Sequence, residues 1–182
     1  MLLIGLVLGF IASASLISQP SIIGNVSTTT IIPGSSVGQI SEYCFSPEGN
    51  CDQVIIRYIN QARNSIHIMI YEFRLKSIEA ALVDARNRGI EIKLVMDRSQ
   101  TQKSSLYSDL KQKGFDVKIA NVKGIMHDKV AIIDGQYVIE GSFNYKTASV
   151  TDNAENLVVI NDVTVTQAYQ NQFQQLYDQG SN

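Results

Sequence analysis

Six residues in the second half of the chain have types and a spacing that suit catalysis. They follow the pattern His-x-Lys-x4-Asp-x6-Gly-Ser-x-Asn and are His127, Lys129, Asp134, Gly141, Ser142 and Asn144. An imidazole can attack phosphorus as a nucleophile, and an ammonium and an amide can bind the non-bridging oxygens of a phosphate in the transition state. A glycine beside a hydroxyl lets donor groups approach the same phosphate closely. The pattern therefore suits cleavage of a phosphodiester, although it supplies no group to protonate the leaving oxygen.

A β-hairpin is the element that would bring these residues together. Residues 130–133, within an expected strand 128–133, and residues 137–139 are apolar runs typical of strands, and residues 134–136 between them form a turn signal. Because side chains alternate along a strand, His127 and Lys129 should project from the same face. The hairpin then returns the chain antiparallel and delivers the Gly-Ser-x-Asn segment to the level of the histidine.

Each of these residues has an ordinary interpretation when it is taken alone. His127 could be a surface or capping histidine, Lys129 a solvated lysine, and the Gly-Ser pair a simple turn. Six positions fixed over eighteen residues are harder to explain in this way than a single glycine-rich loop. The set as a whole favours the catalytic interpretation.

Helical and strand patterns alternate around the hairpin. Apolar residues recur at helical spacing in three segments before it and one after it, and short apolar runs separate them. The expected strands are 66–71, 90–96, 115–120, 128–133, 137–139 and 157–160, and the expected helices are 52–64, 77–88, 104–113 and 163–177. This order predicts the α/β class, with a mixed, largely parallel sheet flanked by helices.

Composition excludes several kinds of site. The chain has 182 residues, enough for one well-cored domain, with only two histidines and two cysteines. A zinc ribbon, a histidine-rich metal cage or an iron–sulfur cluster within one chain would lack ligands, so we expect no metal and no cofactor. The net charge is −2, but all fifteen Lys and Arg lie between residues 57 and 146, against ten Asp and Glu. The middle of the chain is therefore mildly cationic and could receive an anion.

The first 42 residues differ from the rest. Residues 1–23 begin with an apolar run that we interpret as a signal peptide or an N-terminal membrane anchor, with a core helix as the alternative. Residues 24–42 are rich in Ser, Thr and Gly, and we expect a flexible linker there. The catalytic domain then covers residues 43–182. This organisation predicts export, with the domain secreted, periplasmic or anchored to a membrane outside the cytoplasm.

The two cysteines lie close together at the start of this domain. Cys44 and Cys51 enclose a turn-rich segment, and in an exported protein such a pair should form a disulfide. Two buried free thiols are the alternative. A metal pair is disfavoured because neither histidine is near in sequence.

The six-residue pattern matches the signature of the phospholipase D superfamily without a departure, and the chain resembles that family over about residues 43–178. The likeness extends to Cys44-Phe45-Ser46-Pro47, Tyr71-Glu72-Phe73 and Asn153-Ala154-Glu155-Asn156. These segments look like the small single-motif nuclease branch, which includes bacterial endonucleases and membrane-anchored mitochondrial relatives of animals.

The resemblance implies a chemical role for five residues. His127 would be the nucleophile that forms a phosphohistidine, and Lys129 and Asn144 would bind the phosphate. Ser142 would support the same pocket, and Glu155 would hydrogen-bond the imidazole and fix its tautomer.

Other residues have a supporting role or no assigned role. Asp134 would hold the hairpin and its neighbours, and Gly141 would allow close approach of the donors. Glu72 and Lys123 have no assigned role, and we expect surface or rim positions for both.

Family members carry two signature motifs per active site, whereas this chain has one. Met69 stands where a lysine would follow His67 in a second motif. The resemblance therefore implies a homodimer with twofold symmetry, in which His127 of one subunit attacks and the partner's His127 donates the proton. The interface should lie along the motif hairpin.

The expected function is a metal-independent phosphodiesterase that cleaves DNA or RNA as a non-specific endonuclease. One alternative is a phospholipase D-type lipid phosphodiesterase, held on a membrane through the N-terminal segment. The other is a catalytically silent nucleic-acid-binding module of the same fold. The intact pattern counts against a silent module, which would be free to lose His127 or Lys129.

Overall fold

The computed structural model of the chain describes residues 39–101 and 105–182. In these residues seven strands form one sheet, accompanied by five α-helices and one 3-10 helix. The strands are β1 (Gln39–Ser46), β2 (Ser65–Ile70), β3 (Glu91–Met96), β4 (Asp116–Ile119), β5 (Lys129–Ile133), β6 (Tyr137–Gly141) and β7 (Glu155–Asn161). The helices are α1 (Cys51–Gln61), α2 (Lys76–Asn87), the 3-10 helix η1 (Arg98–Gln100), α3 (Tyr107–Gln112), α4 (Thr147–Thr151) and α5 (Val163–Gln179).

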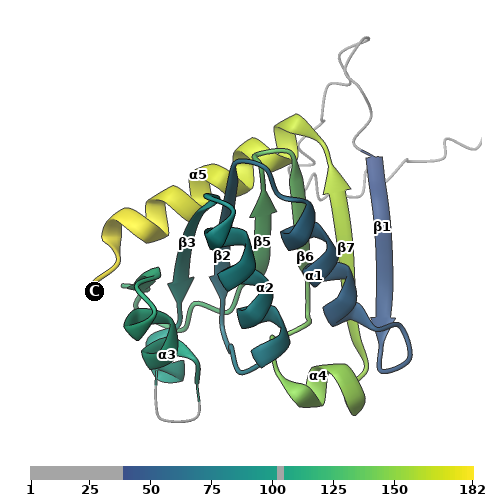
Figure 1. Cartoon of the computed structure of the whole chain (residues 1–182), viewed down its shortest axis with the longest axis horizontal. Helices are drawn as coiled ribbons and strands as arrows, with labels where there is room; N and C mark the ends of the chain where they lie inside the picture. Colours follow the sequence, from purple (N-terminus) through teal and green to yellow (C-terminus); the bar gives the residue numbers. More distant parts are fainter. Residues whose placement is uncertain (1–38, 102–104) are drawn as a thin grey trace, which may run out of the picture. The chain divides into compact units, whose positions relative to one another are not determined.

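The sheet is mixed, and most of its neighbouring strands are antiparallel (Figure 1). Its order is β1-β7-β6-β5-β2-β3-β4. Among the described strands, the β2–β3 and β3–β4 pairs are parallel and the other four pairs are antiparallel. The mixed α/β class with flanking helices is confirmed, but the expectation of a largely parallel sheet is wrong. A parallel pair needs a long crossover, and after β4 the chain continues through a hairpin and a return that pair strands antiparallel.

Helices cover both faces of the sheet (Figure 1). One core contains apolar residues of α1 and α2, such as Ile55 and Leu82, packed against one face. A second core places Phe173 and Leu176 of α5 against the other face. The central strands are therefore buried on both sides, and every residue of β5 is buried. Because β5 is packed on both sides, the position of Lys129 at its start is held firmly.

The first two helices have the features that their sequences indicate. In α1, Val54, Ile55 and Ile59 share one buried face. After α2, Gly89 has φ 88°, a left-handed conformation that glycine adopts without steric penalty and that commonly terminates a helix. The expected terminator of α2 therefore lies between this helix and β3.

The edge strand β1 was not expected from the sequence. It pairs antiparallel with β7, and Cys44 and Ser46 are buried while Tyr43 and Phe45 are exposed. Because β1 begins at Gln39, residues 39–42 belong to the sheet, and the expectation of a linker is wrong for these four residues. The expectations for residues 1–38, the targeting segment and most of the linker, lie outside the described residues.

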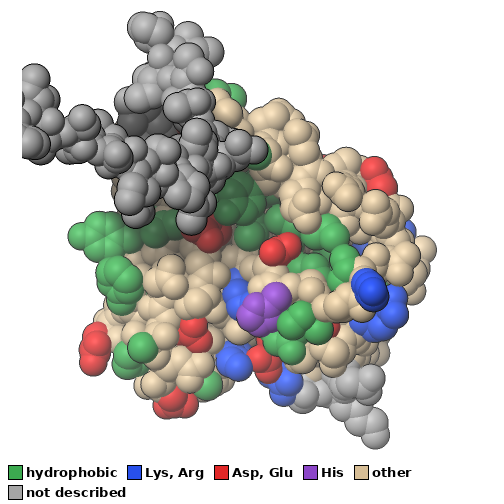
Figure 2. Space-filling model, turned by 180° about the vertical axis from the view of Figure 1, so that it is seen from behind, with side chains coloured by type: hydrophobic (Ala, Val, Ile, Leu, Met, Phe, Trp, Pro, Cys, Tyr) green, Lys and Arg blue, Asp and Glu red, His purple; other side chains and the backbone are tan. Residues whose placement is uncertain are grey.

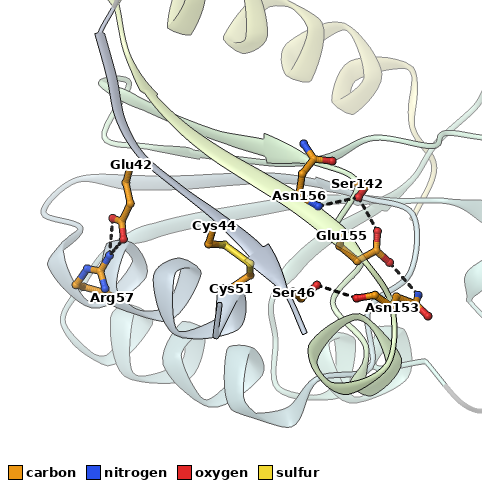
Figure 3. The surroundings of a disulfide bond; sticks show 9 residues. All are labelled: Glu42, Cys44, Ser46, Cys51, Arg57, Ser142, Asn153, Glu155 and Asn156. Atoms are coloured by element: carbon orange, nitrogen blue, oxygen red, sulfur yellow. Dashed lines mark hydrogen bonds and ion pairs between the residues drawn. A yellow bond between two sulfur atoms is a disulfide. The ribbon is translucent and has the colours of Figure 1, made fainter. Parts of the chain in front are cut away.

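A disulfide joins β1 to α1. Cys44 and Cys51 are bonded, which confirms the disulfide interpretation of this pair (Figure 3). Between residues 39 and 182, leaving aside 102–104, no helix combines the length and hydrophobicity needed to cross a membrane.

Candidate active site

His127 and Lys129 lie at one end of the β5–β6 hairpin. Lys129 is the first residue of β5, and His127 lies in the preceding loop with its side chain exposed. Lys129 is only 8% exposed, and its ammonium donates a hydrogen bond to the carbonyl oxygen of His127. Burial lowers the pKa of Lys129, and the nearby carboxylates of Asp128 and Glu155 act in the opposite direction. The arrangement sets an accessible imidazole beside a largely desolvated cation.

The ring of Tyr71 contacts both of these residues. Its centroid lies 4.7 Å from the centroid of the His127 imidazole and 5.1 Å from Nζ of Lys129. An aromatic face attracts a cation electrostatically, so the ring helps to hold the lysine. The side-chain amide of Gln100 donates a hydrogen bond to the Tyr71 hydroxyl at 3.2 Å. Tyr71 therefore forms a wall of the site that the motif spacing did not reveal.

Gly141 and Ser142 bring the end of β6 close to β7. A Cβ atom at Gly141 would lie 2.2 Å from the carbonyl oxygen of Asn156, so only glycine fits this position. The N–H of Ser142 donates to the same carbonyl at 3.1 Å. The N–H of Asn156 donates to Oγ of Ser142, also at 3.1 Å (Figure 3). The close approach that was expected at Gly141 thus serves the pairing of the two strands.

Glu155, the first residue of β7, accepts three hydrogen bonds in the described structure. Two donors are Oγ of Ser142 at 2.6 Å and Nδ2 of Asn153 at 2.9 Å (Figure 3). The third is Oγ of Ser149 at 3.2 Å. Burial alone would raise the pKa of Glu155, but these hydrogen bonds outweigh it and keep the pKa below its usual value. The expected bond to the His127 imidazole is not formed within the single chain, because the carboxylate is engaged by these donors.

Asn144 reaches the site from the segment that follows β6. Its neighbour Tyr145 anchors this segment, because the Tyr145 N–H donates to the carbonyl oxygen of Glu72 at 3.0 Å. The Tyr145 ring also packs edge-on against Phe73, with 5.3 Å between centroids. In the described part of the chain, the buried amide oxygen of Asn144 has no hydrogen-bond partner. An unpaired buried polar group costs about 1–3 kcal/mol, and this oxygen is an acceptor that a donor from another molecule would satisfy.

Glu72 and Lys146 form an ion pair next to the site. Nζ of Lys146 donates to Oε2 of Glu72 at 2.8 Å, and Nε of Arg74 lies 2.7 Å from Oε1. The Glu72 side chain is 13% exposed, so it lies partly buried beside the site and not on the open surface. The pair affects the pKa of Lys129, with Lys146 lowering it and Glu72 raising it.

Asp134 lies at the other end of the hairpin, away from the site. Its Oδ1 accepts hydrogen bonds from the N–H groups of Asn64 at 2.7 Å and Ser65 at 3.0 Å, and its Oδ2 accepts one from the N–H of Arg63 at 2.9 Å. Asp134 and Gly135 have φ values of 56° and 62°, which a tight hairpin turn requires. This geometry agrees with the structural role expected for Asp134.

Asp97, which the sequence interpretation left out, holds the segment that leads to His127. It follows β3 and is 2% exposed. Its Oδ2 accepts a hydrogen bond from the N–H of Met126 at 2.7 Å, and its Oδ1 accepts bonds from the N–H and Oγ of Ser99. Since Met126 directly precedes His127, Asp97 fixes the backbone beside the imidazole. The sequence feature that could have identified Asp97 is a carboxylate directly after an apolar strand.

The groups at the site are nucleophilic and anion-binding. Figure 2 shows histidine, lysine or arginine, and acidic side chains close together in the middle of the face turned away from the viewer in Figure 1. In residues 39–101 and 105–182, no three His, Cys, Asp or Glu side chains gather as a metal site would require. The motif contributes an imidazole, an ammonium, a hydroxyl and an amide from the end of the hairpin opposite Asp134.

A mixed sheet whose central hairpin presents His-x-Lys beside Gly-Ser-x-Asn defines a phospholipase D-like domain. The family described as "Cardiolipin synthase, PLD-like domain" matches residues 55–177. The chain belongs to the phospholipase D superfamily.

Three relatives illustrate this membership. The phospholipase D of Rickettsia bellii is 42% identical over 127 residues, which are 69% of this chain and 63% of the relative. The mitochondrial cardiolipin hydrolase of Chlamydomonas reinhardtii is 30% identical over 148 residues, 80% of this chain and 65% of the relative. The solved structure of Nuc from Salmonella typhimurium, a phospholipase D family member, matches with a TM-score of 0.74 and 31% identity, over 80% of this chain and 97% of that chain. The chain thus spans a little under two thirds of the length of these two curated relatives, and nearly all of Nuc.

Proposed function

We propose that the chain is a metal-independent phosphodiesterase that cleaves DNA or RNA as a non-specific endonuclease. The observation that carries the proposal is the exposed imidazole of His127 next to the buried ammonium of Lys129. The first group can attack phosphorus, and the second can neutralise the charge that develops on the phosphate oxygens.

The reaction proceeds in two displacements. A ring nitrogen of His127 attacks the phosphorus, a phosphorus–nitrogen bond forms, and the bond to the leaving oxygen breaks as that oxygen takes up a proton. Lys129 and the amide of Asn144 bind the non-bridging oxygens during this step. Water then attacks the phosphohistidine, gives up a proton, and releases the phosphate end from the imidazole.

The proton for the leaving oxygen comes from a second subunit. One chain supplies one motif, so a twofold homodimer places the partner's His127 on the opposite side of the phosphate. A carboxylate has about four acceptor sites, so in such a dimer Glu155 can still accept one hydrogen bond from an imidazole across the interface. The end of the motif hairpin that carries His127 is the surface that would meet its copy.

The dimer can be tested by mixing subunits. Wild-type and inactive His127→Ala subunits are mixed at a constant total concentration and allowed to exchange. If each site needs one His127 from each chain, activity should fall as the square of the wild-type fraction. Activity that falls only in proportion to the wild-type fraction, or full activity in a sedimenting monomer, would remove the second subunit from the mechanism.

Nucleic acid is the favoured substrate because of the resemblance to the single-motif nuclease branch and the match to nearly all of Nuc. The cationic middle of the chain also suits a polyanion. A lipid phosphodiester is the second candidate, and the names of the Rickettsia and Chlamydomonas relatives favour it. A silent nucleic-acid-binding module has less support, since the pattern from His127 to Asn144 is intact.

The proposed setting is outside the cytoplasm, with residues 1–23 as a signal peptide or membrane anchor. The disulfide between Cys44 and Cys51 supports this placement, because disulfides persist mainly in oxidising compartments.

A direct test offers DNA, RNA and phosphatidylcholine vesicles to the full chain in excess EDTA. Cleavage of a nucleic acid should survive EDTA, and His127→Ala should abolish it. Loss of cleavage in EDTA with rescue by magnesium would overturn the metal-independent mechanism. If only the lipid were cleaved, the endonuclease proposal would be wrong and the lipid phosphodiesterase would be favoured.

A further inference from the structure

A cleft of about 210 Å³ lies beside the candidate active site. It is formed by η1 and the segment that connects β4 to β5, and its lining includes Asp97, Arg98, Ser99, Lys123, Gly124 and Ile125. None of the residues assigned above to the chemical steps lines this cleft. It is therefore a separate feature that needs its own explanation.

Two contacts connect the cleft to the catalytic histidine. Asp97 in the lining accepts the N–H of Met126 at 2.7 Å, and Met126 directly precedes His127. On the same side, Gln100 at the end of η1 donates to the hydroxyl of Tyr71, whose ring contacts the imidazole. The η1 wall of the cleft is thus fixed relative to the imidazole.

The cleft also lies a short distance from His127. Ile125 in its lining is two residues from His127, so their Cα atoms lie within about 7 Å of each other, the reach of two extended residues. A linear substrate whose scissile phosphate sits at His127 can therefore reach the cleft with its next unit.

The charges of the cleft suit a phosphate. Arg98 on η1 and Lys123 on the connecting segment are exposed cations on its two walls. Nη2 of Arg98 lies 3.4 Å from Oδ1 of Asn121, so this guanidinium extends toward the lysine's segment. Asp97 is 2% exposed, and both of its carboxylate oxygens accept hydrogen bonds from the protein. Its oxygens are therefore not presented to a ligand, and the two exposed cations outnumber this one buried carboxylate in the lining.

We propose that this cleft binds the phosphodiester of a polynucleotide strand adjacent to the one cleaved at His127, through Arg98 and Lys123. The proposal rests on the proposed endonuclease function and adds a subsite to it. A strand repeats its phosphate at every nucleotide, so a second cationic site at a fixed distance adds affinity. Cardiolipin also carries two phosphates, but its acyl chains need a broad apolar surface. Ile125 is the one large apolar side chain of the lining that is exposed, at 57%.

The test compares a long substrate with a minimal one. The full chain, Arg98→Gln, Lys123→Gln and the double variant are assayed on a single-stranded oligonucleotide and on bis(para-nitrophenyl) phosphate, whose single diester has no neighbouring phosphate. Arg63→Gln is the matched control, because it removes an exposed cation at the opposite end of the hairpin, beside Asp134.

In the double variant, the ratio of kcat/KM for the oligonucleotide to kcat/KM for the small diester should fall about tenfold, mainly through KM. The slope of log KM against log salt should decrease by about 0.7, the contribution of one single-strand phosphate contact. The Arg63→Gln control should change neither quantity.

An unchanged ratio and salt slope in the double variant would overturn the subsite while leaving the endonuclease function intact. Wild-type chain that hydrolyses neither substrate would instead overturn the proposed function itself. Vesicles of cardiolipin and phosphatidylcholine form a third arm. If they are cleaved, the oligonucleotide is not, and the double variant loses activity on the vesicles, the cleft belongs to a lipid headgroup and the proposal is wrong.

Discussion

The two ends of the β5–β6 hairpin use their polar side chains in opposite ways. At the turn, the Asp134 carboxylate accepts hydrogen bonds from three consecutive backbone N–H groups of residues 63–65. At the other end, Lys129 is buried with its pKa lowered, the amide oxygen of Asn144 is buried without a partner in the described residues, and His127 is exposed. At the turn, the carboxylate stabilises the fold, whereas at the other end an imidazole is exposed and an amide oxygen is left without a partner.

The difference separates structural from chemical members of a single sequence pattern. Buried polar groups are normally paired, so a fully paired carboxylate has a sufficient explanation in stability. A desolvated ammonium and an unpaired amide have no such explanation, and proteins tolerate such unfavourable groups mainly at functional sites. Substitutions at the two ends should therefore change different observables.

The largest effect is expected for the two histidines. His127→Ala should reduce turnover by roughly 10⁴-fold or more, as loss of a nucleophile does, and should leave the melting temperature nearly unchanged because the side chain is exposed. His67 is the matched control, since its ring stacks on Phe173 with 4.6 Å between centroids and its nitrogens contact Gln170 and Glu91. His67→Ala should lower stability and preserve activity per folded molecule. Thermal melts and initial rates measure the two effects. Wild-type turnover in His127→Ala would contradict the role of His127 as the nucleophile.

Lys129→Met should give the next largest effect. Activity should fall about 10²- to 10³-fold through loss of an electrostatic contact in the transition state. The free energy of unfolding should stay the same or increase, because burial already disfavours the charged lysine and methionine fills a similar volume. Urea denaturation and kcat/KM give the two readouts. If the variant were clearly destabilised but retained its activity, Lys129 would have a structural role and not a chemical one.

Asp134 should show the reverse pattern. Asp134→Ala removes the acceptor of three N–H groups and places alanine at a φ of 56°, so unfolding should become easier by about 2–3 kcal/mol. Asp134→Asn keeps one acceptor oxygen and tolerates the left-handed backbone, and its loss should be about half as large. Activity per folded molecule should stay near wild type in both variants. If Asp134→Asn lost turnover without losing stability, the turn would have a chemical role.

The smallest effect concerns acid pH and Glu155. Its pKa in the folded chain lies below the ordinary value of 4.5, so the ionised carboxylate stabilises the fold. That contribution is complete above the ordinary value and is lost as the pH falls through the lowered value. The stability difference between wild type and Glu155→Gln should therefore shrink on acidification below 4.5. Urea midpoints measured across this range test the sign, and a difference that grows toward acid pH would contradict it.

The sequence allowed the hairpin and its motif to be predicted because both depend on local signals. Strand alternation placed Lys129 in β5, and the turn residues marked the reversal at Asp134. The strand directions away from the hairpin could not be derived in the same way, since they depend on which distant strands pair. Edge strand β1 was missed for a related reason: Tyr43 and Phe45 are exposed, so its alternation does not indicate a buried face.

Contacts between distant segments account for what was missed at the site. Tyr71 and Asp97 follow separate strands, and only the paired sheet brings them to the segment around His127. Glu72 was expected at a surface or rim position because an isolated acid usually lies there. It is partly buried and paired with Lys146, 74 positions further along the chain, which no local pattern connects to it.

The pairing of β1 with β7 makes completion of the domain depend on two segments that are far apart in sequence. The Cys44–Cys51 bond spans only seven positions and needs no distant segment to close. Cys44 is also paired with Leu157, so β1 has no strand partner until β7 has formed, and non-local pairing of this kind is the slow part of folding. Ser46 bonds the carbonyl oxygen of Asn153, beside the Glu155 network, only when β7 is in place. The disulfide loop can thus form early in folding, whereas the Glu155 network beside the candidate site is completed late.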